Sequence, residues 1–340
     1  MVSDDSGQHA AVKGFGRQGL TVGPIAFGGA SIGNLYTEVD DATALDAVDA
    51  AWEAGVRYFD TAPHYGLGES ERRLGQALRR YSREDFIVST KVGRLLKQRS
   101  EQPDSASDDG SDELVRVFDF SRDGVMRSLE SSLQRLGLDR VDVVLVHDPD
   151  DHYSEALDGA FPALEELRAQ GVIRSYGAGM NQSAMLADFI RRTDLDIVML
   201  AGRFTLLEQG ALEDLLPVAL ERGVSVIAAG VFNSGILAKS DPLPGAYYNY
   251  APAPEEVYRR AVRIAETCAE HQVTLPQAAI HFPALHPAVS TVCLGVRSRG
   301  HVMRNAQQYS SPVPPALWRD LADQGLIDER VIAHGLPDTR

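Results

Sequence analysis

Cysteines, long apolar runs and blocks of basic residues are the features that this sequence has least of. Cys268 and Cys293 are the only cysteines in 340 residues, so a disulfide framework is excluded and a reducing compartment is expected. No run of about 18 apolar residues occurs, which argues against a membrane-spanning helix. Lys and Arg number 33 against 48 Asp and Glu, a net charge of −15, so nucleic acid is not an expected partner.

The start of the chain and its overall composition set further limits. The segment MVSDDSGQHAAVKGFG lacks the basic and apolar regions of a secretory signal, so we expect a cytoplasmic protein. With 44% apolar and 24% charged residues, the composition is that of an ordinary globular protein. This length accommodates either two average domains or one large barrel. The oligomeric state stays open.

Short apolar runs alternate along the chain with longer stretches of helical periodicity. The candidate strands are Pro24–Gly28, Val56–Asp60, Phe86–Lys91, Val141–His147, Ser175–Gly179, Ile197–Ala201, Ser225–Ala229 and Ser290–Leu294. The candidate helices are Asp41–Ala54, Ser70–Tyr81, Gly124–Leu136, Glu155–Gln170, Gln182–Arg192, Ala211–Glu221, Pro254–His271, Pro276–Phe282 and Val302–Gln308.

Eight strand–helix units favour a closed (β/α)8 TIM barrel, and near-continuous apolar strands such as VDVVLVH suit a parallel sheet covered on both faces. A doubly wound dinucleotide-binding sheet is the alternative. It would rest on Gly28–Gly33, where the third position of the glycine pattern is Ala30 and no clear helix follows. We therefore interpret residues 1–340 as a single α/β barrel domain.

One segment, at about 94–120 after the third strand, breaks the rhythm. It contains QRSEQPDSASDDGSDE, which is too polar for a core and too long for a routine connection. We expect its middle to be a disordered surface insertion. Because active sites of barrels lie on this face, Arg116–Phe120 is alternatively expected to fold over a substrate.

Polar residues stand where apolar strands end. Asp60 ends RYFD, Lys91 ends IVSTK and His147 ends VDVVLVH, while Tyr65 lies in the loop after Asp60. Each has an ordinary structural explanation, but in a barrel all four converge on the carboxyl-terminal mouth, where such residues are typically catalytic. We predict that they form one catalytic centre.

These residues carry a resemblance to a known family. Phe59-Asp60-Thr61-Ala62-Pro63-His64-Tyr65-Gly66, with Glu69 and Arg73-Leu74-Gly75, resembles the signature of the aldo-keto reductases, and the similarity extends from about Gly19 to Asn305. It implies hydride transfer between NAD or NADP and a carbonyl or hemiacetal, with Tyr65 as acid or base. Lys91 would lower the pKa of the Tyr65 phenol, Asp60 would hold Lys91, and His147 would bind the substrate oxygen.

The resemblance also implies a coenzyme site along the barrel mouth. The implied coenzyme-binding residues are Gly29, Ala30, Asn181, Phe232, Ser234, Gly235, Leu237, Gly295, Arg297, Ser298, His301 and Asn305. The chain departs from the family pattern where nicotinamide is usually held, at Met180, Ala201 and Gly230. Arg297 suits either a 2′-phosphate or a ribose hydroxyl, so the choice between NAD and NADP stays open.

Four segments, Gly28–Ala30, Ile32–Tyr36, Phe118–Ser121 and His147–Asp150, resemble most closely the subgroup that holds D-threo-aldose 1-dehydrogenases, L-fucose dehydrogenases and pyridoxal 4-dehydrogenases. This implies a small-molecule substrate, a sugar oxidised at its anomeric carbon to a lactone. His64, Asp119 and Asp148 are polar residues expected at the mouth, either to bind sugar hydroxyls or to lie in solvated loops. A general NADPH-dependent aldehyde or ketone reductase, a pyridoxal 4-dehydrogenase and a cofactor-binding regulatory subunit are alternatives. The run from His147 to His152 could suggest a metal, but its spacing matches no familiar zinc pattern, so no metal is expected.

Overall fold

The computed structural model describes residues 12–16, 19–35, 37–101 and 113–334. Within them, eight parallel strands close into a barrel in the order β10-β11-β14-β3-β4-β5-β8-β9. The barrel strands are β3 (Ile25–Gly28), β4 (Tyr58–Asp60), β5 (Ile87–Val92), β8 (Val143–His147), β9 (Ser175–Met180), β10 (Ile197–Ala201), β11 (Ser225–Ala229) and β14 (Val289–Gly295). The predicted TIM barrel and all eight predicted strands are confirmed.

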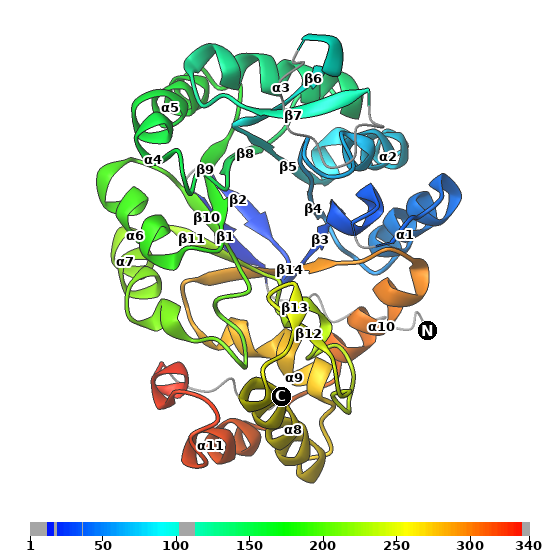
Figure 1. Ribbon diagram of the computed structural model, residues 1–340, viewed down its shortest axis with the longest axis vertical. Coiled ribbons are helices and arrows are strands. Elements are labelled where there is room, and N and C mark those ends of the chain that lie inside the picture. Colours follow the sequence, from blue (N-terminus) through cyan, green and yellow to red (C-terminus); the bar gives the residue numbers. More distant parts are fainter. Residues whose placement is uncertain (1–11, 17–18, 36, 102–112, 335–340) are drawn as a thin grey trace, which may run out of the picture.

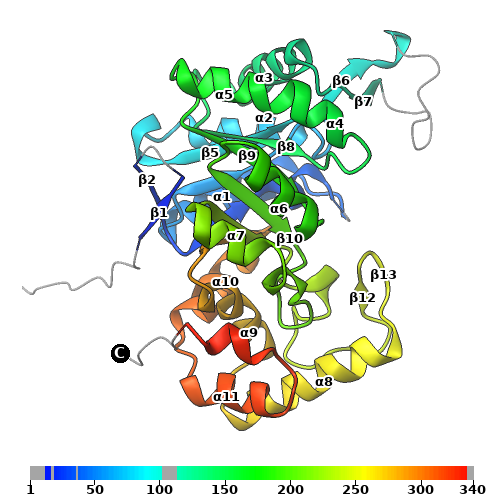
Figure 2. The same ribbon diagram turned by 90° about the vertical axis from the view of Figure 1, so that its left-hand side faces the viewer.

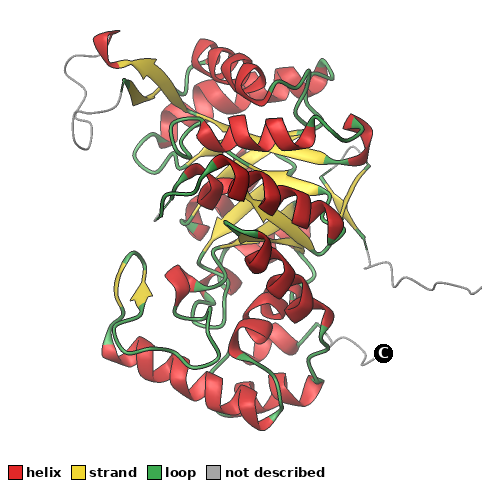
Figure 3. Ribbon diagram, turned by 90° about the vertical axis from the view of Figure 1, so that its right-hand side faces the viewer, coloured by secondary structure: helices red, strands yellow, loops and turns green. Residues whose placement is uncertain are grey.

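Helices surround the barrel on its outside (Figure 1, Figure 3). They are α1 (Asp41–Glu53), α2 (Glu69–Leu78), α3 (Arg122–Leu136), α4 (Tyr153–Glu155), α5 (Phe161–Ala169), α6 (Ser183–Arg192), α7 (Leu215–Arg222), α8 (Glu255–Glu270), α9 (Leu275–His281), α10 (Arg299–Ser310) and α11 (Pro315–Asp323). None of these helices in the described part of the chain has the length and apolar character needed to span a bilayer.

Two of the predicted helices differ from those observed, and one observed helix was missed. The predicted helix Ala211–Glu221 begins later, at Leu215, because the side chain of Asp214 caps the backbone there and Gly210–Leu212 forms a separate 3-10 turn. The predicted Glu155–Gln170 helix contains a π-helical turn at Ala156–Ala160. Helix α11 was not predicted. It follows the last of the eight strand–helix units in the sequence, so the repeating pattern did not indicate it.

Three antiparallel hairpins, none of them predicted, decorate the two ends of the barrel: β1 (Lys13–Phe15) with β2 (Leu20–Val22), β6 (Arg94–Gln98) with β7 (Leu114–Phe118), and β12 (Tyr247–Tyr248) with β13 (Ala251–Pro252). The β6–β7 and β12–β13 hairpins project from the same face, and β1–β2 lies at the opposite end (Figure 2). The β6–β7 and β12–β13 hairpins thus flank the carboxyl-terminal mouth, where the strand-end polar residues lie.

Two hydrophobic cores result from the alternation of side chains along the strands. One lies between the barrel and the helices, and the other fills the barrel interior. Phe15, Leu20 and Val22 of the β1–β2 hairpin belong to the interior core, so this hairpin plugs the amino-terminal end of the barrel. The carboxyl-terminal end, which this hairpin does not cover, is where active sites of such barrels lie.

The predicted insertion is partly described. Its flanks form the β6–β7 ribbon, in which Arg94 pairs with Phe118 and Gln98 with Leu114. The ends of the segment are thus ordered, while residues 102–112, where its predicted disordered middle falls, lie outside the described residues. Gly159 in the π-helical turn accommodates the ribbon's end, because a Cβ there would lie 2.5 Å from the carbonyl oxygen of Phe120.

Close packing of α2 against α3 generates a testable consequence for stability. A Cβ at Gly75 would lie 1.9 Å from the carbonyl oxygen of Leu136. We expect Gly75→Ala to lower the free energy of unfolding by about 1–3 kcal/mol or more, because backbone must move to relieve the overlap. Urea unfolding measures this. Gly300→Ala, at a helical site with open space, is the matched control and is expected to be neutral or slightly stabilising. Equal effects of the two changes would contradict this packing.

Candidate active site

The barrel brings the strand-end residues together at one mouth. Asp60 is the last residue of β4, His147 is the last residue of β8, and Lys91 lies in β5 between them. Tyr65 follows β4 in a turn closed by a hydrogen bond from its backbone N–H to the carbonyl of Ala62. The turn is short and bonded to the strand end, so it places the Tyr65 ring over the Lys91 ammonium, 4.7 Å from Nζ to the ring centroid.

Lys91 and Asp60 form a buried ion pair. The side chains are 1% and 3% exposed, and Lys91 Nζ donates to Asp60 Oδ2 at 2.6 Å. Lys91 also donates to the carbonyl oxygen of Thr61 at 3.1 Å. Burial acts to lower the pKa of Lys91, but Asp60 and Tyr65 outweigh it and raise that pKa above its ordinary value. The ammonium is therefore charged throughout the physiological pH range.

Tyr65 is a protonated phenol in this environment. Desolvation is the main reason that its pKa is raised to about 12, and Asp60 raises it further, while the charge and hydrogen bond of Lys91 act in the opposite direction. The expected lowering by Lys91 is thus present but is outweighed. Tyr65 remains partly exposed at the mouth, so a small molecule has access to its ring and hydroxyl.

His147 is buried beside Tyr65. Their ring centroids lie 5.7 Å apart at 87°, and the ring centroid of His64 lies 5.6 Å from that of His147. Burial, with the nearby charge of Lys91 and Arg94, holds the pKa of His147 well below its ordinary value. The imidazole is therefore neutral and carries one N–H, which suits it to donate a hydrogen bond to a neutral or negative oxygen.

An ion pair borders His147 on the ribbon side. Arg94, the first residue of β6, donates to Asp148 Oδ2 at 2.9 Å, and its guanidinium lies 5.2 Å from the Phe118 ring centroid. Asp148 Oδ2 is 3.6 Å from His147 Nε2. The backbone of Asp148 has φ of 41°, a conformation that non-glycine residues rarely adopt and that turns the chain sharply after β8. Arg94 was not among our predicted site residues.

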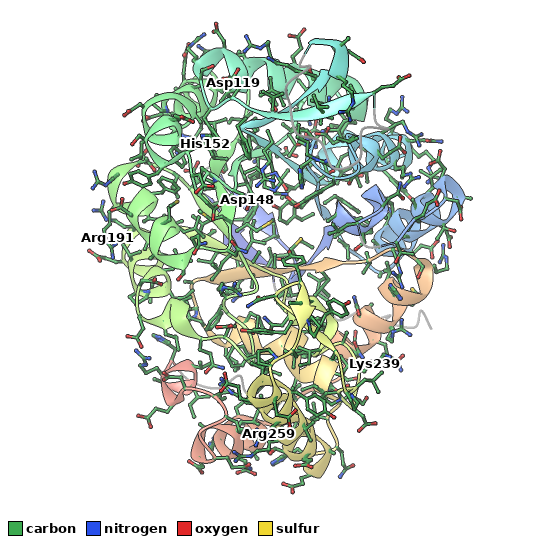
Figure 4. The ribbon with its side chains drawn as sticks, viewed as in Figure 1. Asp119, Asp148, His152, Arg191, Lys239 and Arg259 are labelled. Carbon is green, nitrogen blue, oxygen red and sulfur yellow. The ribbon has the colours of Figure 1, made fainter. Side chains whose placement is uncertain are left out.

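The three predicted hydroxyl-reading residues are placed differently. His64 and Asp148 lie beside His147, as just described. Asp119 lies farther from the barrel centre, towards α3 (Figure 4), where it accepts hydrogen bonds from Ser121 Oγ and Arg127 at 2.6 and 2.8 Å. Its carboxylate thus organises the start of α3, and its role towards a substrate stays a prediction.

The loop after β11 has the shape of an anion cradle. Four of its residues have positive φ, namely Gly230, Asn233, Ser234 and Gly235, and open space surrounds Gly235. Buried Asn233 donates to the carbonyl of Gly202, and its Oδ1 has no hydrogen-bond partner in the described part of the chain. Ser234 Oγ accepts from the backbone of Tyr250, which ties the β12–β13 hairpin to this loop.

The contacts of several other predicted coenzyme-binding residues are packing contacts within the fold. Leu237 is fully buried in the outer core, and Phe232 packs against that core. Gly29 has no room for a side chain, because a Cβ would lie 2.6 Å from Ser70 Oγ and 2.7 Å from the Asp60 carbonyl oxygen. Ala30 shares the 3-10 turn Gly29–Gly33, and Asn181 follows β9 in a partly exposed position.

Helix α10 presents its N-terminus after β14. Ser298 caps it by accepting from the backbone N–H of His301, and Gly295 and Arg297 precede it in exposed positions. Arg297 Nη1 donates to Thr37 Oγ1 at 3.0 Å. A 12-residue helix that Arg297 closely precedes is a suitable place for a phosphate group. Asn305 lies in the following turns of the same helix.

The residues present fit a nicotinamide dinucleotide. The positive-φ backbone of the loop after β11, with the open glycine at 235, can present N–H groups to an anion, while the unpartnered Oδ1 of Asn233 suits a hydrogen-bond donor of the coenzyme. The α10 N-terminus with Arg297 provides a second anion site. The first place suits the pyrophosphate of either coenzyme, and the second suits the 2′-phosphate of NADP or the ribose hydroxyl of NAD. The individual coenzyme contacts stay predictions.

A large cavity of about 1130 Å³ lies elsewhere. It is lined by residues that precede the strands, such as Arg57, Arg83 and Arg174, and by the inner side of α10, including Asn305. This is the amino-terminal end of the barrel, opposite the Lys91–Tyr65 centre. Arg83 is already paired with Asp142 at 2.6 Å. Because catalytic residues of barrels lie at the carboxyl-terminal end, we interpret the polar residues at this end as stabilising the fold.

The structure adds residues that our sequence analysis did not single out. Ser89 donates to Asp60, and Glu71, fully buried, accepts from Thr90 at 2.6 Å and pairs with Arg135. The Glu71 pair ties α2 to β5 and α3. A signal for Ser89 was available, because residues two apart on a strand face the same side and Ser89 precedes Lys91 by two. Nothing in the sequence pattern marks the Glu71 pair, which spans three elements.

Comparison with known proteins agrees with this geometry. The model of the aldo/keto reductase family matches residues 24–322. The chain belongs to this family. A D-threo-aldose 1-dehydrogenase from Pseudomonas sp is 44% identical over 91% of the chain and 96% of its own length. A pyridoxal 4-dehydrogenase from Microbacterium luteolum is 41% identical over 93% and 97%. The holo form of an aldo-keto reductase from Bacillus halodurans superposes with a TM-score of 0.74 at 27% identity, covering 94% of this chain and 97% of that one.

Membership of the aldo/keto reductase family identifies the chain as an oxidoreductase enzyme that uses a nicotinamide coenzyme. The resemblance expected from the motif around Asp60 and Tyr65 is confirmed, including its subgroup.

The buried neutral His147 predicts a pH dependence of stability. Its pKa is lowered in the folded state, so the unfolded chain binds the proton more tightly. Stability is unaffected above the unfolded value near 6.5 and falls as pH decreases below it, by up to about 1.4 kcal/mol per pH unit. Urea unfolding between pH 7.5 and 5 measures the slope. We expect His147→Gln to reduce this acid slope, and an identical slope in the variant and the native protein would contradict the assignment.

Proposed function

We propose that this chain is an NAD(P)-dependent dehydrogenase that oxidises a sugar of L-fucose or D-threo-aldose type to a lactone. The observation that carries this proposal is the buried Lys91 ammonium, which is held by Asp60 and Thr61 and lies under the ring of Tyr65 beside a neutral His147. The 44% identity to a D-threo-aldose 1-dehydrogenase supports the substrate class.

The proposed reaction acts on the cyclic hemiacetal. Its anomeric carbon loses a hydride and its anomeric hydroxyl loses a proton, which leaves the C=O of a lactone. The bound nicotinamide coenzyme accepts the hydride. The chain's own residues manage the proton and the oxygen that carries it.

Tyr65 is the group proposed to take the proton. Its raised pKa keeps it protonated in the free protein, so it is poised as an acid for reduction. For oxidation it must become a phenolate, and Lys91 is the cation that stabilises that form. The two directions thus use one hydroxyl, with the ion pair to Asp60 keeping Lys91 in place.

His147 is proposed to hold the reacting oxygen. A neutral imidazole donates one N–H, and it does not release a proton into the site as an imidazolium would. His147 Nδ1 is buried with no hydrogen-bond partner in the described part of the chain, and the other nitrogen, Nε2, faces Asp148 at 3.6 Å. The buried unpartnered nitrogen marks the site as incomplete without a ligand.

Asp148 and Arg94 are proposed to read sugar hydroxyls. A carboxylate that accepts and a guanidinium that donates, held 2.9 Å apart, match the alternating donor and acceptor character of neighbouring hydroxyl groups. The pair lies next to His147, so hydroxyls adjacent to the anomeric carbon would meet it. The His64 ring also lies next to His147, with centroids 5.6 Å apart.

A pyridoxal-type aromatic substrate is the second candidate. The Phe118 ring is 51% exposed at the mouth and stacks on Phe120 with centroids 6.1 Å apart. His152 packs against both rings, with centroids at 4.7 and 5.1 Å, so a flat substrate ring could contact the exposed part of this aromatic cluster. The 41% identity to a pyridoxal 4-dehydrogenase supports the same substrate. A general NADPH-dependent aldehyde reductase remains the broader alternative. Either NAD or NADP is compatible with the exposed Arg297.

A substrate panel with Tyr65→Phe tests the proposed function. L-fucose, D-arabinose, L-galactose, pyridoxal and simple aldehydes are offered with NAD+ and NADP+, or with the reduced coenzymes for the aldehydes, and followed by coenzyme absorbance. We expect turnover of a sugar, and a loss of about 10²- to 10⁴-fold in kcat for Tyr65→Phe, because the proton-transfer group is removed. Coenzyme binding by the variant is the control. Full turnover by Tyr65→Phe would refute the proposed role.

Asp148→Asn separates the substrate classes. Loss of a charge-assisted hydrogen bond to a sugar hydroxyl is expected to raise KM for the sugar about tenfold, with a smaller effect on an aldehyde that has no hydroxyl groups. Steady-state kinetics on both substrates measure the split. Asp151→Asn, an exposed position in the same loop, is the matched control. An unchanged sugar KM would count against hydroxyl recognition by Asp148.

A further inference from the structure

A buried hydrogen-bond chain runs beneath the active site. The hydroxyl of Tyr58 donates to Ser89 Oγ at 2.9 Å, and Ser89 Oγ donates to Asp60 Oδ1 at 2.7 Å. Tyr58 is 1% exposed and Ser89 is fully buried. These hydrogen bonds therefore connect the Lys91–Asp60 ion pair to Tyr58 in the barrel interior.

The alternation of strand side chains produces this line of groups. Tyr58 and Asp60 are two apart on β4, and Ser89 and Lys91 are two apart on β5, so all four face inward. The register pairs Asp60 directly with Ser89. Apolar residues pack around Tyr58, including Phe15 with ring centroids 5.1 Å apart, so Ser89 is the partner available to its hydroxyl.

This arrangement assigns each oxygen of Asp60 to one donor. Ser89 occupies Oδ1, and Lys91 occupies Oδ2 at 2.6 Å. Lys91 has three N–H groups, of which one goes to Asp60 and one to the Thr61 carbonyl. The third is the one left for the Tyr65 hydroxyl. A carboxylate free to rotate would not hold Lys91 in that orientation.

We propose that Ser89 and Tyr58 are positioning residues for hydride transfer, because they lock the Asp60 carboxylate and thereby direct the remaining Lys91 N–H at Tyr65. The inference rests on the proton-transfer role proposed above for Tyr65. Tyr58 acts only through Ser89, and Ser89 acts only through Asp60. Neither residue touches the substrate.

Several other ionisable groups surround the Tyr58–Ser89–Asp60 hydrogen bonds. Lys91 comes from β5 and His147 from β8, while Cys293 comes from β14 as a thiol whose pKa is raised by burial. Arg94 and His64 lie near His147. Burial and the Asp60 charge raise the pKa of Tyr58 well above its ordinary value, so its hydroxyl stays a donor.

Ser89→Ala, Tyr58→Phe and the double variant test the proposal. With the best substrate of the panel, whichever class it belongs to, we expect kcat to fall about tenfold in Ser89→Ala and less in Tyr58→Phe. The double variant should match Ser89→Ala alone, because Tyr58 has no other route to Asp60. The acid limb of the oxidation pH profile should move to higher pH, since Lys91 stabilises the phenolate less. Additive losses, or an unmoved profile with KM alone altered, would overturn the proposal.

Ser128→Ala is the matched control, since Ser128 is a buried serine on α3 whose hydroxyl has no hydrogen-bond partner in the described part of the chain. It should leave kcat and the pH profile unchanged. If Ser89→Ala does not fold, Tyr58→Phe, which removes one oxygen atom, carries the test through its own pH shift.

A readout without turnover separates this inference from the proposed function. With tyrosine labelled at Cζ by 13C, the Tyr65 resonance is assigned by its absence in Tyr65→Phe. We expect it to shift in Ser89→Ala and to stay in place in Ser128→Ala, whether or not any sugar is oxidised. An unshifted Tyr65 resonance in Ser89→Ala would defeat the positioning role, whereas failure of the sugar panel alone would defeat only the proposed substrate.

Discussion

The charge of Lys91, buried at the mouth of the barrel, is the constraint on which the site depends. An ammonium removed from water needs a counter-charge and acceptors for its protons, and a missing partner would leave an uncompensated buried charge that costs several kcal/mol. Asp60 supplies the charge at 2.6 Å and the Thr61 carbonyl supplies a second acceptor. Asp60 ends β4 and Thr61 directly follows it, so the register between β4 and β5 is tied to the same requirement.

The surroundings of this pair follow from the same logic. Desolvation makes Tyr65 a protonated phenol and His147 a neutral imidazole, so the mouth holds one cation, one anion and two neutral hydrogen-bonding groups. These four groups together carry no net charge. The Arg94–Asp148 ion pair, next to the β6–β7 ribbon, also has no net charge.

The barrel and the four central residues were predictable for a physical reason. A strand buried on both faces is apolar throughout, so Asp60, Lys91 and His147 at strand ends stand out against their neighbours, and parallel strands bring their carboxyl ends to one rim. The hairpins were less predictable. The β6–β7 ribbon joins two stretches across a long polar segment, and no local periodicity marks a pairing between positions as distant as Arg94 and Phe118.

Roles of single carboxylates were harder still to assign from sequence. Asp119 and Asp148 look alike in the sequence, each in a polar loop after a strand, yet Asp119 binds Ser121 and Arg127 while Asp148 meets Arg94 and His147. The difference arises from the direction in which each loop leaves the barrel. Ser89 is the opposite case, because its inward orientation follows from its spacing to Lys91, but its bond to Asp60 required the strand register.

The sequence by itself determined the repeating strand–helix order, the inward phase of each strand and the chemical identity of the groups at the mouth, because these depend on residue type and local spacing. Tertiary structure alone decided which of those groups touch, how far burial moves their pKa values and which carboxylate faces the site. Those properties depend on distance and on solvent exclusion, and both are set only when strands far apart in the chain close the barrel around Lys91.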